Sequence, residues 1–381
     1  MTIQIKEVNS AGDLKKFVHF PNVLYADNPY YVPQLESTDR DTLNPKKNRA
    51  FEVCEAKYWL AYDEKNNIIG RIAGIINHKY NDFVKSKICR FGFIDFIDSQ
   101  DVVNALIQTV ENYAMEKGME EIEGPYGFLE FDVAGVLVEG FDKIATPYGK
   151  YNYPYYEPLL IATGLVPTTN YVERFIKVPD SVSERILRAN DLVAERYNLH
   201  HGKLKKHRDI LKYADRIFEC MNRAYSVLHG YSILSPGQCE DLKNQFFKFI
   251  DVQYCSVILD ADENVVGFGI CAPDIAKALQ KNSGRLFPFG FIPVLKALKH
   301  NDIMDTLLIA TDEEYRNKGV TAMIVARILP NMIKNGYKYI ESTRELEDNT
   351  KIQNFWKGYE SVVHKRARTY LKKLDYGSKK I

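Results

Sequence analysis

A short segment in the C-terminal part of the sequence combines backbone and charged groups that could bind a phosphate. Residues 306–311 have the apolar pattern of a buried strand, and a helix is expected to begin at Gly319 after a short loop. The first N–H groups of a helix have no partner within it, and they coincide with the positive end of its dipole. Gly319 lets the backbone approach a ligand closely, while Arg316 and Lys318 add mobile positive charge. We therefore predict a pyrophosphate-binding turn; the alternative is an ordinary strand–helix connection with two solvated basic residues.

Length and composition limit the class of protein. The chain has 381 residues, which suggests two domains, and its 25 tyrosines and 20 phenylalanines favour pockets lined by aromatic rings. A formal charge of +1 argues against a general nucleic-acid-binding protein. No run approaches the ~18 apolar residues of a membrane span, and the start lacks the apolar run of a signal peptide. The six cysteines show neither a CxxC pair nor metal-ligand spacing, so we expect a cytoplasmic protein with reduced thiols and no metal site.

The two halves of the sequence repeat one plan. In each half, helical segments precede a hairpin, and a strand and a helix follow; the hairpins turn at residues 63–67 and 262–264. This pattern predicts duplicated α+β domains rather than one large sheet. We place the domains at residues 1–178 and 200–381, joined by a bridging helix within 179–199 that has an apolar stripe.

The loop residues Arg316-Asn317-Lys318-Gly319-Val320-Thr321 resemble the cofactor-binding signature of the GNAT (GCN5-related N-acetyltransferase) superfamily. The sequence departs from that signature at Thr321, where the family has Gly or Ala, and Ala322 comes one position late. Residues 349–359, with Asn349 at the start and Trp356 near the end, resemble the second signature of the family. Many members have a tyrosine at the Trp356 position that protonates the leaving thiolate, which an indole cannot do.

The sequence is also similar, over nearly its full length, to a family of bacterial proteins with two GNAT-like domains, in segments such as 28–33, 124–128 and 284–290. This resemblance implies a mixed α/β sheet in tandem GNAT-like domains and acetyl-CoA or another acyl-CoA as cofactor. The implied cofactor contacts are the backbone of Ile309, Ala310 and Thr311, the loop residues Arg316, Asn317, Lys318, Gly319, Val320, Thr321 and Ala322, and Asn349 and Trp356.

The N-terminal half lacks the corresponding loop. Residues 96–101 enter the helix with Asp98 and Asp101 and with no Arg, Lys or Gly. Two aspartates would repel a diphosphate, so we expect one cofactor per chain, bound in the C-terminal domain.

Carboxylates on the strand after the loop are candidates for the general base. Glu341 lies within the expected strand 337–342, and Glu345 follows it. Burial would raise the pKa of such a carboxyl toward neutrality. The alternative for Glu341 is a structural ion pair with Arg344 or Arg366. Backbone N–H groups near Ala310 and Thr311 are candidates for steadying the oxyanion.

Each of three further segments has more than one interpretation. The region 124–156 could wall an acceptor pocket through Tyr126, Phe128, Tyr153, Tyr155 and Tyr156, or these rings could form a core. Residues 273–300 could be a lid over the acyl end or a packing insertion. The basic run 365–373 alternates like an edge strand, and its charges could attract a phosphate, an acidic lipid surface, or nothing.

The sequence thus predicts an acyl-CoA-dependent N-acyltransferase acting on a small-molecule amine bound between the domains. Two alternatives remain open. One is transfer from aminoacyl-tRNA or another carrier, against which the near-neutral charge argues. The other is a non-catalytic binding protein, suggested by Thr321 and Trp356. Acyl length, acceptor identity and oligomeric state do not follow from the sequence.

Overall fold

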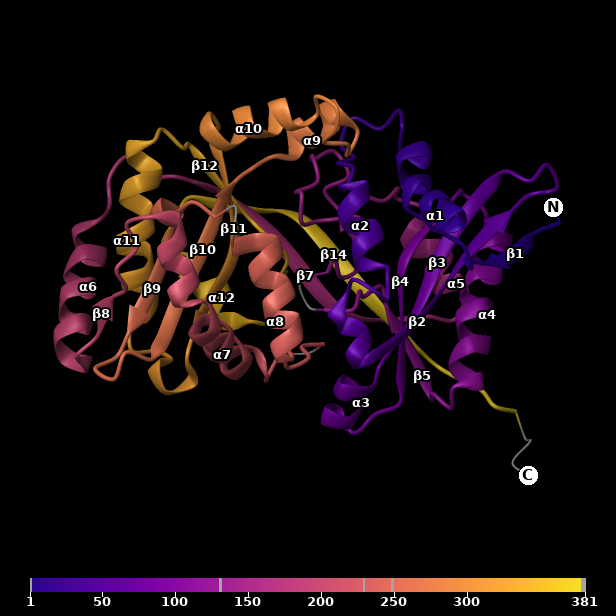
Figure 1. The fold of residues 1–381 in the computed structure, drawn as a ribbon, viewed down its shortest axis with the longest axis horizontal. Coiled ribbons are helices and arrows are strands. Elements are labelled where there is room, and N and C mark those ends of the chain that lie inside the picture. Colours follow the sequence, from indigo (N-terminus) through magenta and orange to yellow (C-terminus); the bar gives the residue numbers. More distant parts are fainter. Residues whose placement is uncertain (1, 130–131, 229, 248–249, 378–381) are drawn as a thin grey trace.

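The computed structural model describes residues 2–129, 132–228, 230–247 and 250–377. Within them the strands form one fourteen-stranded mixed sheet, along which the two halves of the chain lie side by side (Figure 1). The strand order is β1-β2-β3-β4-β5-β14-β7-β12-β11-β10-β9-β8, with β6 paired to β14 and β13 paired to β7.

The N-terminal half carries the first twelve helices and strands. They are β1 (Gln4–Glu7), α1 (Ala11–Leu24), α2 (Glu36–Thr42), β2 (Cys54–Tyr62), β3 (Ile68–Asn77), α3 (His78–Val84), β4 (Ile88–Phe96), α4 (Gln100–Glu116), β5 (Glu121–Gly124), β6 (Val136–Glu139), α5 (Tyr156–Ala162) and β7 (Val166–Lys177).

The C-terminal half repeats this order and adds a helical insertion. Its elements are α6 (Glu184–Tyr197), β8 (His200–His201), α7 (Ala214–Tyr225), α8 (Pro236–Leu242), β9 (Cys255–Leu259), β10 (Val265–Pro273), α9 (Ala276–Asn282), α10 (Phe291–Lys299), β11 (Ile303–Thr311), α11 (Val320–Lys334), β12 (Tyr339–Ser342), β13 (Glu345–Leu346), α12 (Thr350–Trp356) and β14 (Ser361–Lys373).

Short-range interactions explain the duplicated hairpins. Asp63 Oδ1 accepts hydrogen bonds from the N–H groups of Lys65 and Asn67, which closes the β2–β3 turn. Asp260 Oδ1 closes the β9–β10 turn in the same way. An aspartate that bonds to the backbone two and four residues ahead mimics a backbone turn, so the local sequence is sufficient to fix both hairpins. The predicted repeat of hairpin, strand and helix is confirmed.

The expectation of two separate sheets is wrong, because the halves exchange their last strands. β14, from the end of the chain, lies between β5 and β7, and β7, from the N-terminal half, pairs with β12 (Figure 1). β14 is therefore central rather than an edge strand. Its basic residue Lys365 is tolerated there because carboxylates on β7 and β12 surround it, as described below.

Apolar cores cover both faces of the sheet in the C-terminal half. α7 packs on β9, β10 and β11 on one face, while α11 and the bridging helix α6 pack on the other. The helix predicted within 179–199 is thus confirmed as α6, whose cap is Ser183. α11 runs from Val320 to Lys334 and continues past Pro330. None of the helices in the described residues is long and apolar enough to cross a membrane.

Candidate active site

Strands β11 and β12 diverge in the C-terminal half. Their parallel pairing covers Ile303–Thr306 and Tyr339–Ser342 and ends there, whereas β11 stays paired to β10 as far as Thr311. The edge of residues 307–311 that faces β12 is therefore not bonded to a neighbouring strand within the described residues. The Tyr225 hydroxyl of α7 donates to the Ile309 carbonyl, 2.8 Å away. In this wedge between the two strands, and apart from the Ile309 carbonyl, which Tyr225 occupies, this side of β11 has no strand partner among the described residues in the region where the sequence predicts cofactor contacts at Ile309, Ala310 and Thr311.

The turn after β11 presents free amides. The N–H groups of Arg316, Lys318 and Ala322 are bonded to the carbonyls of Glu313, Tyr315 and Gly319. The N–H groups of Asn317, Gly319, Val320 and Thr321 donate to no acceptor in the described part of the chain. These four donors lie at the start of the fifteen-residue helix α11, so its dipole adds to their attraction for an anion.

Gly319 is required at this position for two reasons. Its φ of +86° lies in the left-handed region, and a Cβ atom would come within 2.8 Å of Val193 Cγ2 on α6. The packing of the bridging helix and the shape of the turn thus depend on the same residue.

The prediction that Arg316 and Lys318 carry mobile positive charge is wrong, because both side chains are held by neighbouring groups. Arg316 Nη2 donates to the Ala224 carbonyl at 2.8 Å, and Nη1 lies 3.1 Å from Glu313 Oε1. Lys318 Nζ lies 5.1 Å and 4.8 Å from the ring centroids of Tyr197 and Tyr315. Arg316 therefore braces the turn against α7, and Lys318 is held between two aromatic rings.

Glu345 and Trp356 form a buried pair at the β12 side of the wedge. Trp356 Nε1 donates to Glu345 Oε1 at 2.8 Å, and Glu345 Oε2 is buried without a hydrogen-bond partner among the described residues. Burial raises the pKa of Glu345 to about 7, although the Trp356 bond and the charge of Arg174 oppose the rise. A carboxyl with this pKa exchanges protons readily near neutral pH.

The other predicted base, Glu341, is held in ion pairs. Its Oε1 lies 2.5 Å from Lys365 Nζ and 3.0 Å from His364 Nε2, and Lys365 also pairs with Glu173 at 2.9 Å. The predicted ion pair of Glu341 with Arg344 or Arg366 is wrong, because neither arginine is its partner. Arg344 forms an ion pair with Glu173, and Arg366 forms ion pairs with Glu139 and Glu347. The geometry favours a structural role for Glu341.

Asp305 is a candidate that the sequence analysis missed. It is fully buried on β11 in register with Glu341, and neither of its carboxylate oxygens has a hydrogen-bond partner among the described residues. Burial and the charges of Asp274 and Glu341 raise its pKa well above the ordinary value. The apolar run around Asp305 was the available signal; the predicted strand began at Thr306, one residue too late to include it.

The site adjoins the N-terminal half. Arg344 Nη2 donates to the Lys150 carbonyl at 3.1 Å, and its Nε to Glu173 Oε1 at 3.1 Å. A narrow crevice lies nearby, with walls from both halves; its lining includes Thr146, Gly149, Lys150, Glu173 and Lys365. A depression of about 390 Å³ lies elsewhere, between residues 51–54 and α3, and its lining includes none of the candidate residues.

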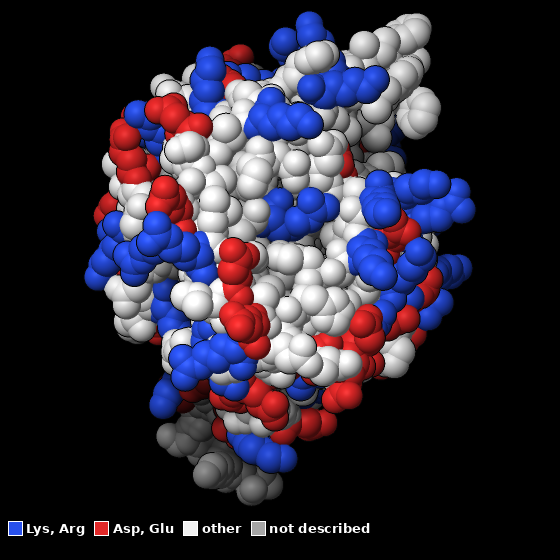
Figure 2. All heavy atoms as spheres, turned by 90° about the vertical axis from the view of Figure 1, so that its left-hand side faces the viewer, with Lys and Arg blue, Asp and Glu red and all other residues white. Residues whose placement is uncertain are grey.

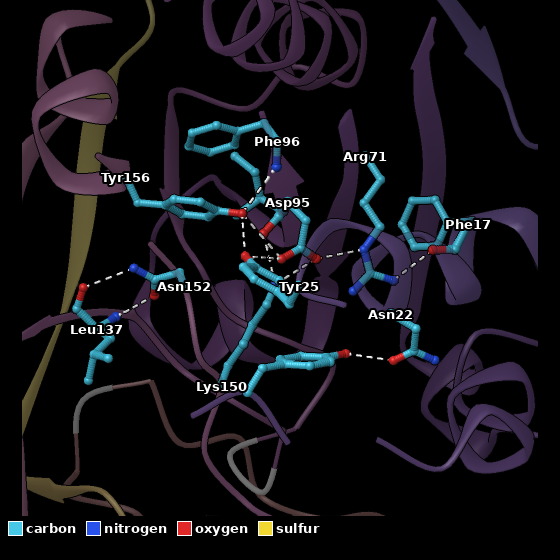
Figure 3. A network of polar contacts seen from close by, with 12 residues as sticks. Phe17, Asn22, Tyr25, Arg71, Asp95, Phe96, Leu137, Lys150, Asn152 and Tyr156 are labelled. Carbon is cyan, nitrogen blue, oxygen red and sulfur yellow. Dashed lines mark hydrogen bonds and ion pairs between the residues drawn. The ribbon is translucent and has the colours of Figure 1, made fainter. Parts of the chain in front are cut away.

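One of the tyrosines predicted to bind substrate, Tyr156, belongs to a polar network in the N-terminal half. Asp95 accepts hydrogen bonds from Arg71 (2.7 Å), Lys150 (2.9 Å) and Tyr25 (3.0 Å), and the Tyr156 hydroxyl lies 2.5 Å from that of Tyr25 (Figure 3). Burial lowers the pKa of Lys150 to about 8, although the charge of Asp95 opposes the change.

Most of these rings face the protein rather than an open pocket. Phe128 and Tyr156 are fully buried, and Tyr126 is 4% exposed. The Tyr155 and Tyr153 hydroxyls donate to the carbonyls of Phe96 and Leu24. These positions favour the core interpretation for Phe128 and Tyr156, and substrate binding by the five rings remains a prediction.

No family model matches the sequence. The chain is 24% identical to Protein YghO of Escherichia coli (strain K12) over 374 residues, covering 95% of this chain and 93% of that protein. It is 22% identical to the bacterial ceramide synthase of Caulobacter vibrioides (strain NA1000 / CB15N) over 388 residues, covering 98% of each.

Solved structures share the architecture at low sequence identity. A tandem GNAT protein from the clavulanic acid biosynthesis pathway superposes with a TM-score of 0.55 at 10% identity, covering 99% of this chain and 100% of that one. A GCN5-related N-acetyltransferase from Sphaerobacter thermophilus gives a TM-score of 0.52 at 9% identity, covering 98% and 96%. The divergent strands, the turn before α11 and these superpositions together show that the chain has the tandem GNAT fold, as its sequence predicts.

Proposed function

We propose that the protein transfers an acyl group from acyl-CoA to the amine of a long-chain amino alcohol. The unpaired edge of β11, which leads directly into four free amides at the start of α11, is the observation that carries this proposal. The likeness to a bacterial ceramide synthase over 98% of both chains supports the acceptor class, since a ceramide is an N-acylated long-chain amino alcohol.

The residues present fit an acyl-CoA. The amides of Asn317, Gly319, Val320 and Thr321 would hold the pyrophosphate, and the backbone of residues 309–311 would hold the pantetheine arm. When bound, acyl-CoA supplies a thioester whose acyl group the amine attacks. Free backbone N–H groups on the diverging strand would steady the charge that develops on the thioester oxygen.

The N-terminal half supports a stoichiometry of one cofactor per chain. β4 and β5 pair over Ile88–Arg90 and Glu121–Glu123. Beyond this, the hydroxyls of two tyrosines engage the backbone of Phe96 at the end of β4: Tyr156 accepts from its N–H, and Tyr155 donates to its carbonyl. The equivalent backbone groups are thus occupied by side chains of α5.

Carboxyl side chains of this chain would bind the acceptor and move its proton. Asp305, whose two carboxyl oxygens lack partners in the described residues, would form hydrogen bonds with the polar head of the acceptor, and because its pKa is raised it would do so mainly as the neutral acid. Glu345 would accept the proton, because its pKa of about 7 leaves part of it ionised at neutral pH and the geometry gives its Oε2 no hydrogen-bond partner among the described residues, although the Ser342 hydroxyl lies close enough to lower the pKa.

Product formation tests the proposal. We expect a long-chain acyl-CoA and a long-chain 2-amino-1,3-diol to yield amide and free thiol in equal amounts, measured by mass spectrometry and thiol titration. For Glu345→Gln we expect a loss of roughly 10²- to 10⁴-fold in kcat, together with loss of the rise in rate through pH 7. Tight CoA binding without amide formation across a panel of amines would contradict the proposal and indicate a binding protein.

A further inference from the structure

The insertion between β10 and β11 carries a cluster of exposed apolar side chains. Phe287 and Phe289 are 82% and 72% exposed, the highest values for large apolar residues in the described chain. Ile292, Leu295 and Phe291 follow at 54%, 53% and 40%. Large apolar groups concentrated in so short a segment are unusual on a free protein surface and indicate a contact.

The geometry of α10 places part of this cluster on one face. Phe291 and Leu295 are four residues apart, and Ile292 lies beside them, so the three share one side of the helix. Lys296 and Lys299 are also exposed and border the same side. No residue of this nine-residue helix is buried, so the apolar face is not explained by packing within the chain.

Between Asp274 and Asp302 at its two ends, the insertion carries charge of one sign. Residues 275–300 contain five basic residues and no aspartate or glutamate, in a chain whose overall formal charge is +1. The basic residues are Lys277, Lys281, Arg285, Lys296 and Lys299, of which Arg285 forms an ion pair with Glu36 at 3.4 Å. In Figure 2, Lys and Arg side chains lie beside a projecting uncharged surface at the top, the end of the molecule where α9 and α10 lie in Figure 1.

The insertion is fixed to both halves. Gln280 Nε2 donates to the Pro29 carbonyl at 2.8 Å, and the Glu36 N–H donates to the Gly284 carbonyl at 3.3 Å. Where the insertion begins and ends, the Asp274 N–H donates to the carbonyl of Ile303, which lies two residues before Asp305. The exposed cluster is therefore held in a defined position and connects directly to the buried carboxylates.

We propose that residues 285–299 dock on the surface of an anionic lipid bilayer. The phenylalanines and the apolar face of α10 enter the interface between headgroups and acyl chains, while the flanking basic residues bind acidic headgroups. The combination of projecting apolar rings with uniformly positive flanks favours a bilayer over a second copy of this nearly neutral chain. If the proposed function holds, docking delivers a membrane-resident long-chain amine to the site; the docking itself does not depend on catalysis.

Sedimentation with vesicles tests the docking. We expect the protein to bind vesicles of phosphatidylcholine mixed with phosphatidylglycerol and to bind pure phosphatidylcholine much more weakly, with binding that weakens as salt is added. The double variant Phe287→Ser/Phe289→Ser should lose at least about tenfold in partitioning. The matched control Phe83→Ser, at a 52% exposed position on α3, should bind like the wild type.

A fluorescence measurement covers the case in which the serine variant does not fold. Both native tryptophans, Trp59 and Trp356, are buried at 7% and 6% exposure, so a Phe289→Trp variant adds a distinguishable exposed reporter. We expect its emission to shift to shorter wavelength with anionic vesicles. No vesicle binding by the wild type would overturn the proposal. So would equal binding by the serine variant, or concentration-dependent dimerisation that the variant abolishes.

Discussion

The buried carboxyl of Glu345 should make the stability of the protein depend on pH in a way that one substitution removes. Burial raises the pKa of Glu345 from its ordinary 4.5 to about 7. A carboxyl whose pKa is raised on folding contributes fully to stability below its unfolded pKa, and the contribution is lost as pH rises through the folded value. The difference between the two pKa values corresponds to about 3 kcal/mol, lost between pH 4.5 and pH 7.

Glutamine at this position is neutral at every pH and can still accept the Trp356 hydrogen bond. The Glu345→Gln variant should therefore gain stability relative to the wild type as pH rises from 5 to 8, by about 3 kcal/mol at most. In thermal melts this corresponds to a shift on the order of 5 °C in the difference between the two midpoints. The amide of glutamine accepts a weaker hydrogen bond from Trp356 than the carboxylate does. This lowers the stability of the variant by an amount that does not vary with pH above 7.

The assay is a set of paired melts in buffers from pH 5 to 8, with Glu347→Gln as control, because Glu347 is exposed and its substitution leaves the wedge unchanged. A midpoint difference for Glu345→Gln that stays constant across this range would refute the reasoning. It would mean that Glu345 ionises at its ordinary pKa, and it would remove the main argument for Glu345 as the base.

Three further substitutions test the surroundings of the site. Gly319→Ala forces a positive φ on a residue with a Cβ and crowds Val193, so we expect a loss of about 1–2 kcal/mol of stability in denaturant unfolding and at least tenfold weaker CoA binding; unchanged binding would show that the turn does not hold the cofactor. Lys365→Met removes the cation that two buried carboxylates share, which leaves Glu173 with Arg344 and Glu341 with His364, and it should cost about 3 kcal/mol at pH 8 and less at pH 5; a pH-independent effect would argue against that electrostatic cause. Asp305→Asn removes a carboxyl that resists ionisation, so we expect at least about 1 kcal/mol of added stability at pH 7 together with reduced amide formation; reduced stability would show that Asp305 has a structural partner.

Features set by neighbouring residues followed from the sequence. The Asp63 and Asp260 turns, the start of α11 at Gly319 and the bridging helix depend on contacts within a few positions, which local pattern captures. The repeat of these local units predicted the duplicated order of helices and strands, whereas the GNAT fold was predicted from the resemblance of residues 316–321 and 349–359.

Features that depend on contacts between distant residues could not be predicted from the sequence. The charge alternation of residues 365–373 indicated an edge strand, because nothing near Lys365 shows that Glu173 and Glu341 neutralise it at the centre of the sheet. The side chain of Arg316 was expected to be mobile, but Ala224, 92 positions away, holds it. Asp305, which is buried in register with Glu341 of β12, was missed because the expected strand began at Thr306, one residue after it.

Calorimetric titration with CoA tests the central claim most directly, because it counts sites without requiring the acceptor. The account predicts one CoA per chain for the wild type, with binding at least about tenfold weaker in Gly319→Ala, whose changed amides are those of the proposed pyrophosphate site. Absence of binding to the wild type, or two equivalents per chain, would contradict it; the second result would mean that the tyrosines at Phe96 do not close the N-terminal half to the cofactor.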